Sequence, residues 1–166
     1  QAFYETRTSV LASTQKPELD FYAQGVVLDG ARLSGKLDLV ELRDDGVYVT
    51  DYKTGKALGD WSEAKKSAYE KIKQHHYRQQ LYFYKLLVDG SRDYGARGRK
   101  AVRGELVFVE PTKEGIETLE LDLQDSDEIE RLQRLIAVVW KRIQNLDFPE
   151  TSGYDSSIEG IRQFEQ

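Results

Sequence analysis

The chain contains 166 residues, which is enough for one domain with a sizeable hydrophobic core. Hydrophobic residues make up 39% and charged residues 32%, a composition typical of globular rather than disordered or fibrous proteins. The absence of cysteine excludes disulfides, thiol catalysis and cysteine-ligated iron–sulfur clusters. No stretch reaches the roughly 18 apolar residues of a membrane span, so we expect a cytoplasmic protein with no membrane contact.

The charges are divided unevenly along the chain. The net charge of −5 argues against a general polyanion-binding protein. Residues 62–104, however, carry eleven Lys and Arg against four Asp and Glu, whereas residues 105–130 carry ten Asp and Glu and a single Lys. This asymmetry suggests two surfaces with different roles, although two solvated faces of opposite sign would give the same pattern.

The first part of the chain predicts a meander of antiparallel strands. Residues 1–12 are expected to form the end of a helix. Three strands, dense in β-branched and aromatic side chains, are expected at residues 18–28, 32–42 and 47–53. Asp29-Gly30 is a two-residue hairpin signal, and residues 44–46 predict the next turn.

The second part predicts two helices and two more strands. One helix is expected over residues 62–88, and Gly90 would end it. The sequence pattern does not decide whether this helix is interrupted near His75. The strands are expected at residues 102–109 and 116–123. Asp125 or Ser126 can cap a last helix. Apolar residues in this helix step by three and four and predict one buried stripe, formed by Ile129, Leu132, Leu135, Ile136, Val139, Trp140 and Ile143.

This order of elements, β-β-β-α-β-β-α, predicts an α/β fold in which helices pack against a mixed sheet. Proline occurs three times, never in an obvious linker, and no internal repeat is evident. We therefore expect residues 1–166 to form a single domain.

Charged residues interrupt the apolar pattern of two neighbouring strands. Because side chains alternate along a strand, Asp51 and Lys53 project to the same face, with the carbonyl of Tyr52 between them. Asp38 interrupts the preceding strand, and antiparallel pairing would bring it to the same site. Two carboxylates and a carbonyl suit Mg²⁺ or Mn²⁺, which would activate a bound water and stabilise charge on a phosphodiester. Lys53 would orient that water or offset transition-state charge.

A glutamine joins this group from the predicted helix. Steps of four, three and four define an inward face that contains Tyr77, Leu81, Tyr84 and Val88. Gln80 lies on the same face, and because a buried amide needs partners, it could bridge a water, a carboxylate or a phosphate. The alternatives are an exposed Asp51–Lys53 ion pair and a glutamine bonded to a nearby strand carbonyl.

Three segments together resemble a known family. They are Gly35-x-x-Asp38, then Asp51-Tyr52-Lys53-Thr54-Gly55-Lys56, then Gln80-Leu81-x-x-Tyr84. Their order, spacing and placement on strand, strand and helix resemble the RecB-like branch of the PD-(D/E)XK nuclease superfamily. The resemblance covers roughly residues 18–88, about half of the chain, and it strongly disfavours the two alternatives above.

The resemblance implies a restriction-endonuclease-like fold, with helices flanking a mixed central sheet, and a metal-dependent deoxyribonuclease that hydrolyses phosphodiester bonds. By motif, the catalytic residues would be Asp38, Asp51, Lys53, Gln80 and Tyr84. The two aspartates and the Tyr52 carbonyl would hold Mg²⁺ or Mn²⁺, and Lys53 would be the catalytic lysine. Gln80 and Tyr84 would support the active site and the DNA backbone.

Members of this branch often form the C-terminal part of a helicase chain. Because the chain contains no Met, Gln1 is not a translation start, and we expect a fragment of a longer helicase that acts in DNA repair or recombination. Helicase domains, in the same or a partner chain, are then expected partners. Two alternatives stay open: a catalytically weak or inactive DNA-binding or scaffolding module of a helicase, and a stand-alone exonuclease.

Two features depart from the family pattern. Relatives often carry an upstream His or Glu that completes the metal site, but residues 1–17 contain no His. Glu5 and Glu18 are the acidic candidates, and Glu18 is preferred as a further metal ligand; otherwise the ligand precedes Gln1. Many relatives also hold an iron–sulfur cluster through cysteines, which this chain lacks.

Basic and aromatic side chains are candidates for contacts with DNA. Single-stranded DNA or DNA ends are the expected substrate, read with little base specificity because phosphate contacts carry no sequence information. The predicted phosphate-binding residues are Lys56, Arg78, Arg92, Arg97, Arg99 and Lys100. Trp61 and Tyr69 could stack on an unpaired base, although packing is the more common role. His75 and His76 point about 100° apart on a helix and are expected at the surface rather than on one metal ion.

Overall fold

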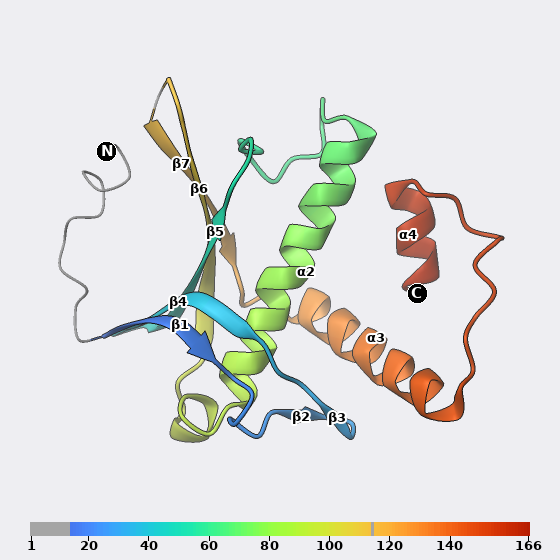
Figure 1. The fold of residues 1–166 in the computed structure, drawn as a ribbon, viewed down its shortest axis with the longest axis horizontal. Coiled ribbons are helices and arrows are strands. Elements are labelled where there is room, and N and C mark those ends of the chain that lie inside the picture. The colour runs from blue at the N-terminus through green and yellow to red at the C-terminus, as the bar shows by residue number, and fades with distance from the viewer. Residues whose placement is uncertain (1–13, 114) are drawn as a thin grey trace.

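A five-stranded sheet and a long helix that crosses one of its faces form the centre of the computed structural model, which describes residues 14–113 and 115–166 (Figure 1). Across the sheet the strands are β1 (Gln15–Asp20), β4 (Lys36–Arg43), β5 (Gly46–Lys53), β6 (Ala101–Thr112) and β7 (Gly115–Asp122). Strands β5 and β6 are parallel, and the other neighbours are antiparallel. The predicted mixed sheet flanked by helices is confirmed. The helix end expected in residues 1–12 lies outside the described residues.

The strands predicted at residues 18–28 and 32–42 are wrong in their bounds. Strand β1 ends at Asp20, whose carboxylate accepts a hydrogen bond from the Tyr22 N–H at 2.7 Å and turns the chain out of the sheet. The predicted Asp29-Gly30 turn forms, with φ of 47° and 84°. It joins only the two-residue strands β2 (Val27–Leu28) and β3 (Ala31–Arg32), which form a separate small sheet. The meander therefore consists of β1, β4 and β5, with the hairpin outside it.

Helix α2 (Ala68–Gly90) begins six residues later than the predicted helix and continues without a break past His75. Its start is set by a capping box, in which the Ser67 hydroxyl accepts from the Glu70 N–H at 3.3 Å and the Glu70 carboxylate accepts from the Ser67 N–H at 2.9 Å. The residues between 62 and 67 form turns that lead into this cap. Two local hydrogen bonds, rather than the apolar pattern, thus decide where the helix begins.

Helix α2 lies close against β5 and β6, and its predicted inward face is largely buried. A Cβ atom added at Gly104 of β6 would lie 3.0 Å from the Leu81 side chain, so a larger residue would force Leu81 to shift by a few tenths of an ångström. At the far end of the helix, Lys85 donates to the Ala101 carbonyl at 2.7 Å, and the Asp89 carboxylate accepts from the Ala101 N–H at 2.7 Å. These two bonds fix where β6 starts alongside β5.

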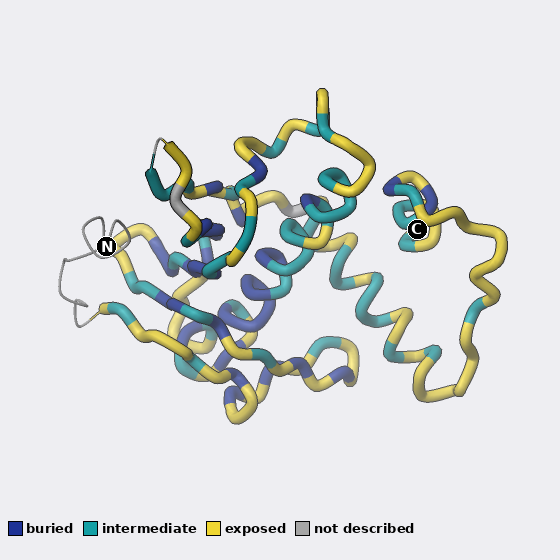
Figure 2. Tube along the Cα trace, turned by 45° about the horizontal axis from the view of Figure 1, so that its top comes forward, coloured by how far each residue is buried: buried dark blue, intermediate teal, exposed yellow. Residues whose placement is uncertain are grey.

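Helix α3 (Ser126–Asn145) is capped by the Asp125 carboxylate, as predicted. The predicted buried stripe is wrong at Val139 and Ile143, which are 43% and 46% exposed, and its other members are half-buried. The helix packs mainly against α2 and the β2–β3 hairpin, and Figure 2 shows half-buried and exposed positions along its second half. A short helix, α4 (Ile158–Phe164), forms in the polar tail and returns to α2. No helix in the described ranges is long and apolar enough to span a bilayer.

Candidate functional site

The candidate site lies where the apolar pattern of β5 gives way to charged residues. Val47 and Val49 point from β5 into the core beneath α2, and Asp51 and Lys53 continue the same face two and four residues later. The side chains of Asp51 and Lys53 are only 6% and 17% exposed. The strand therefore carries a carboxylate and an ammonium group into the space between the sheet and α2.

The Asp51 carboxylate is held by two donors from α2. The Tyr84 hydroxyl donates to Asp51 Oδ1 at 2.8 Å, and Gln80 Nε2 donates to the same oxygen at 2.9 Å. Gln80 Nε2 also donates to the Tyr84 hydroxyl oxygen at 2.7 Å, and Gln80 Oε1 accepts from Lys53 Nζ at 2.7 Å. The predicted residues Asp51, Lys53, Gln80 and Tyr84 thus form one connected network.

The second oxygen of Asp51 is in a different situation. Lys53 Nζ lies 2.7 Å from Asp51 Oδ2, but this ion pair does not have the geometry of a hydrogen bond. Oδ2 is buried and has no hydrogen-bond donor. The Lys53 ammonium group is the close partner of this oxygen, so a metal ion bound here would share the oxygen with Lys53 or displace it.

Asp38 approaches the same place from β4. The β4–β5 register pairs Leu39 with Thr50, and continuing it by one residue sets Asp38 opposite Asp51 on the same face of the sheet. Asp38 Oδ2 accepts from the Tyr52 backbone N–H at 2.8 Å, which ties this carboxylate to β5. The backbone of Tyr52, the residue between Asp51 and Lys53, is therefore directly connected to Asp38.

The environment of Tyr84 keeps its hydroxyl protonated. Burial raises the pKa of Tyr84 most strongly, and the nearby negative charges of Asp51 and Asp38 raise it further. The Tyr84 hydroxyl is therefore a donor to Asp51 at neutral pH. Its role in the network is to hold the carboxylate rather than to exchange protons.

Glu18 does not reach this network. It sits on β1 between two residues paired with β4, which makes it a backbone neighbour of Asp38. Its φ of 50° interrupts the pairing, and its side chain, 76% exposed, binds Lys36 Nζ at 2.7 Å. This hydrogen bond lowers the pKa of Glu18. In the described part of the chain, no cluster of three or more His, Cys, Asp or Glu residues is placed to hold a metal. Glu5 lies outside the described residues.

The two histidines lie on α2 away from the carboxylates. His75 Nε2 is 2.9 Å from Glu165 Oε2 of the segment after α4, and His76 is exposed. The expected surface position is therefore wrong for His75, whose side chain is 14% exposed because it packs against Glu165, and holds for His76. His75 serves a contact between helices that the sequence pattern did not indicate, because α4 itself was not predicted.

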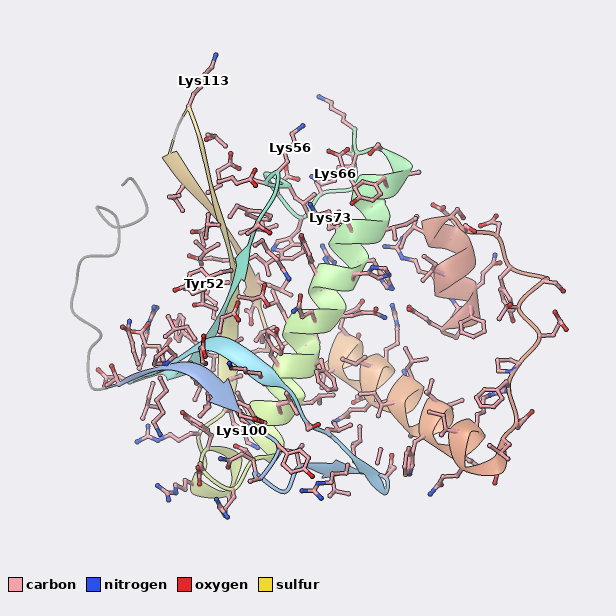
Figure 3. All side chains as sticks on the ribbon, in the orientation of Figure 1. Tyr52, Lys56, Lys66, Lys73, Lys100 and Lys113 are labelled. Carbon is pink, nitrogen blue, oxygen red and sulfur yellow. The ribbon has the colours of Figure 1, made fainter. Side chains whose placement is uncertain are left out.

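Basic residues gather at both ends of α2. Lys56 follows β5 and lies near Lys73 of α2, whose Nζ donates to the Lys56 carbonyl at 3.4 Å (Figure 3). Arg78 instead donates to the Trp61 carbonyl at 3.1 Å and covers the Trp61 ring, and the Trp61 indole donates to the Glu120 carbonyl. Trp61 thus packs against β7, as its more common role suggested, whereas Tyr69 is 72% exposed.

The other four predicted DNA-binding residues lie at the opposite end of the sheet, in the loop that follows α2. They are exposed and consist of Arg92, Arg97, Arg99 and Lys100. Helix α2 ends ten residues after Gln80, and a helix rises about 1.5 Å per residue, so the loop begins about 15 Å from Gln80. Figure 3 shows Lys100 far from Lys56 and Lys73. These residues therefore belong to a basic region separate from the one beside Asp51.

One neighbour of the network was expected only as a packing residue. The Tyr77 ring lies one turn before Gln80, with its centroid 4.6 Å from Lys53 Nζ. Its place on the inward face was visible in the sequence. Its contact with Lys53 depends on how closely α2 approaches β5, which no local pattern encodes.

Comparisons with known proteins place this geometry in context. A family model described as the PD-(D/E)XK nuclease superfamily matches residues 3–155. Among solved structures, the crystal structure of SSO0001 matches with a TM-score of 0.42 and 18% sequence identity. That match covers 82% of this chain and 57% of the other, so this chain spans less than two thirds of that protein. No curated protein matches the chain.

Proposed function

Because the chain belongs to the PD-(D/E)XK nuclease superfamily, we propose that it is a metal-dependent DNA nuclease domain that hydrolyses phosphodiester bonds. The observation that carries this proposal is the network in which Asp51 is held by Gln80 and Tyr84 while Lys53 lies beside it. A core residue would not need this arrangement, because burying four polar side chains costs free energy that apolar residues would not. The restriction-endonuclease-like sheet holds Asp38 on β4 next to Asp51 and Lys53 on β5.

Members of this superfamily use divalent metal ions, and the residues present fit one. Asp51 Oδ2 is a buried carboxylate oxygen whose close partner is the Lys53 ammonium group, and Asp38 is bound to the adjacent backbone through one oxygen. Oxygen ligands of this kind suit Mg²⁺ or Mn²⁺. Asp38, Asp51 and the Tyr52 carbonyl would hold the ion, and Glu18 would join them only after releasing Lys36. The ion would supply Lewis-acid stabilisation of the phosphodiester.

The remaining residues orient the reacting groups. Gln80 accepts from Lys53 and donates to Asp51, so it sets the distance between the ammonium group and the carboxylate. The Lys53 ammonium group would then offset the negative charge that develops on the phosphate or orient the attacking water. Tyr84 completes the support by holding Asp51 Oδ1, so that Oδ2, which faces Lys53, is the oxygen that would bind the ion.

The substrate and context follow from the resemblance to the RecB-like branch. We propose single-stranded DNA or DNA ends as the substrate, and the C-terminal nuclease part of a cytoplasmic repair or recombination helicase as the setting. Residues 1–166 would form the single nuclease domain of that longer chain. The exposed basic residues Lys56, Arg97 and Arg99 support contacts with phosphates. An inactive binding module is the alternative that the next experiment separates, whereas a stand-alone exonuclease would show the same activity and is distinguished only by the length of the full chain.

The test is degradation of labelled single-stranded DNA with Mg²⁺ or Mn²⁺. We expect activity in the wild type, its loss on chelation, and a decrease of at least about 100-fold in Asp51→Asn and Lys53→Ala. Asp44→Asn and Lys141→Ala, at exposed positions, are the matched controls. Circular dichroism checks that each variant is folded. Activity that survives both site variants rejects the site. If the protein binds DNA with an affinity that decreases as salt increases, but hydrolyses no DNA with any metal ion, the result supports the binding module instead.

A further inference from the structure

Tyr77 lies between two lysine side chains at the edge of the candidate site. Its ring centroid is 4.6 Å from Lys53 Nζ and 5.5 Å from Lys73 Nζ. Phe108 of β6 supports the ring from the sheet side, with centroids 6.3 Å apart and an interplanar angle of 53°. An ammonium group within about 6 Å of a ring centroid is attracted by the ring quadrupole. One aromatic ring therefore holds two cations.

This way of holding a cation preserves its charge. A carboxylate would neutralise Lys73, but none forms an ion pair with it among the residues that the structure describes. Its Nζ instead donates to the Lys56 carbonyl at 3.4 Å. The ring and the carbonyl fix the position of the ammonium group while its unit of positive charge remains for a ligand. Lys53 likewise retains Asp51 as its only anionic partner there.

The two ammonium groups are also close to each other. Because both distances are measured to the same ring, Lys53 Nζ and Lys73 Nζ are no more than about 10 Å apart. Lys53 is part of the network around Asp51. Lys73 lies on α2 one helical turn before Tyr77, toward the loop that carries Lys56. A single nucleic-acid strand can contact both.

We propose that Tyr77 is a positioning residue for Lys53 and that Lys73, held by the same ring, binds a DNA phosphate next to the scissile one. The proposal rests on the proposed nuclease function and adds two residues to it. The ring sets the direction of both ammonium groups, so its loss affects the chemical step through Lys53. Lys73 does not face Asp51, so its loss affects DNA binding more than the chemical step.

The experiment compares four variants on labelled single-stranded DNA with Mn²⁺. We expect Tyr77→Leu to lower kcat about tenfold, as loss of a partly desolvated cation–π contact predicts, and Tyr77→Phe to stay within about threefold of wild type. Lys73→Gln should raise KM more than it lowers kcat, and its DNA affinity in EDTA should depend less on salt, by about 0.7 in the log–log slope. Lys71→Gln, the same charge change on the same helix, is the control.

A readout independent of turnover tests the geometry itself. In protein labelled with ¹³C-lysine, the ring current of Tyr77 should move the ε-methylene resonances of Lys53 and Lys73, assigned from Lys53→Ala and Lys73→Gln. The shifts should persist in Tyr77→Phe and vanish in Tyr77→Leu. Their absence from the wild type, wild-type kcat in Tyr77→Leu, or equal salt dependence of Lys73→Gln and Lys71→Gln would overturn the proposal. Lack of turnover in the wild type, with ring-current shifts present, would refute the nuclease function instead.

Discussion

At the scale of single residues, the buried Asp51 carboxylate is the feature that the surrounding side chains must accommodate. A charge with 6% exposure is tolerable only with donors and a counter-ion close by. Gln80 and Tyr84 provide the donors, and Lys53 the positive charge. The same contacts that make burial possible also orient the carboxylate, so stability and the proposed chemistry depend on the same hydrogen bonds.

Replacing Tyr84 with Phe tests this dependence. The variant removes the hydroxyl donor to Asp51 and the acceptor for Gln80 Nε2 while keeping the ring in place. Because the lost bond is to a charged group, we expect the free energy of unfolding to fall by about 1.5–3 kcal/mol in urea denaturation. Tyr69→Phe, at an exposed position, should change it by less than about 0.5 kcal/mol. Equal stability of the two variants would show that the Tyr84 hydroxyl does not support Asp51.

At the scale of elements, the attachment of α4 depends on polar contacts made by residues distant in the sequence. Arg162 donates to the carboxylate of Glu63, in the turns before α2. Glu165 binds His75 at 2.9 Å and accepts from Gln79 at 2.8 Å, both on α2. Ile158, 2% exposed, is the main apolar anchor. A seven-residue helix is too short to be stable alone, so these contacts hold it.

This attachment should weaken in acid. The hydrogen bond from Arg162 lowers the pKa of Glu63 in the folded protein below its ordinary value of 4.5. A lowered carboxyl pKa stabilises the contact above pH 4.5, and this stabilisation is lost as the pH falls through the folded-state pKa. Amide-exchange protection factors of α4, relative to α2, should therefore decrease below about pH 4.5.

Glu63→Gln provides the matched test of that prediction. The neutral side chain should reduce α4 protection at neutral pH and remove most of its acid dependence, whereas Glu110→Gln, at an exposed position on β6, should behave like the wild type. If α4 protection in Glu63→Gln falls in acid as steeply as in the wild type, the Glu63–Arg162 pair does not govern the attachment.

At the scale of the whole molecule, positive charge is split between two ends of α2. Lys53, Lys56 and Lys73 lie near the candidate site, whereas the loop after α2, which begins about 15 Å from Gln80, carries its own exposed arginines. A stacked strand advances about 3.4 Å per nucleotide, so about four to five nucleotides separate the two regions. A long strand can contact both at once, and a very short one cannot.

The double variant Arg97→Gln/Arg99→Gln tests this separation. With a 12-nucleotide strand its affinity should fall several-fold and its log–log salt slope should decrease by about 1.4, while with a 4-nucleotide strand both should match the wild type. Fluorescence anisotropy in EDTA measures both. Lys113→Gln/Lys141→Gln gives a control with the same net charge. Equal losses on both strand lengths would mean that the loop does not form a separate contact.

Much of the local structure could be predicted from short-range patterns. The alternation in β5, the Asp29-Gly30 turn and the Asp125 cap each depend on residues within a few positions of one another, and all three are present. The two strands predicted at residues 102–109 and 116–123 overlap β6 and β7. The metal, catalytic and DNA-binding roles assigned from the motifs stay predictions, although the structure brings four of the five catalytic candidates into one hydrogen-bonded network.

The sequence alone was sufficient for the fold class, the order of the central elements and the group of polar residues that define the family, because strand alternation, helix periodicity and motif spacing are local properties. Only the tertiary structure decided that β1 pairs with β4, that α4 returns to α2, that Tyr77 faces Lys53, and that the arginine loop lies far from Asp51. These outcomes depend on how closely distant segments approach, which is set by long-range contacts such as Gly104 with Leu81 and Lys85 with Ala101.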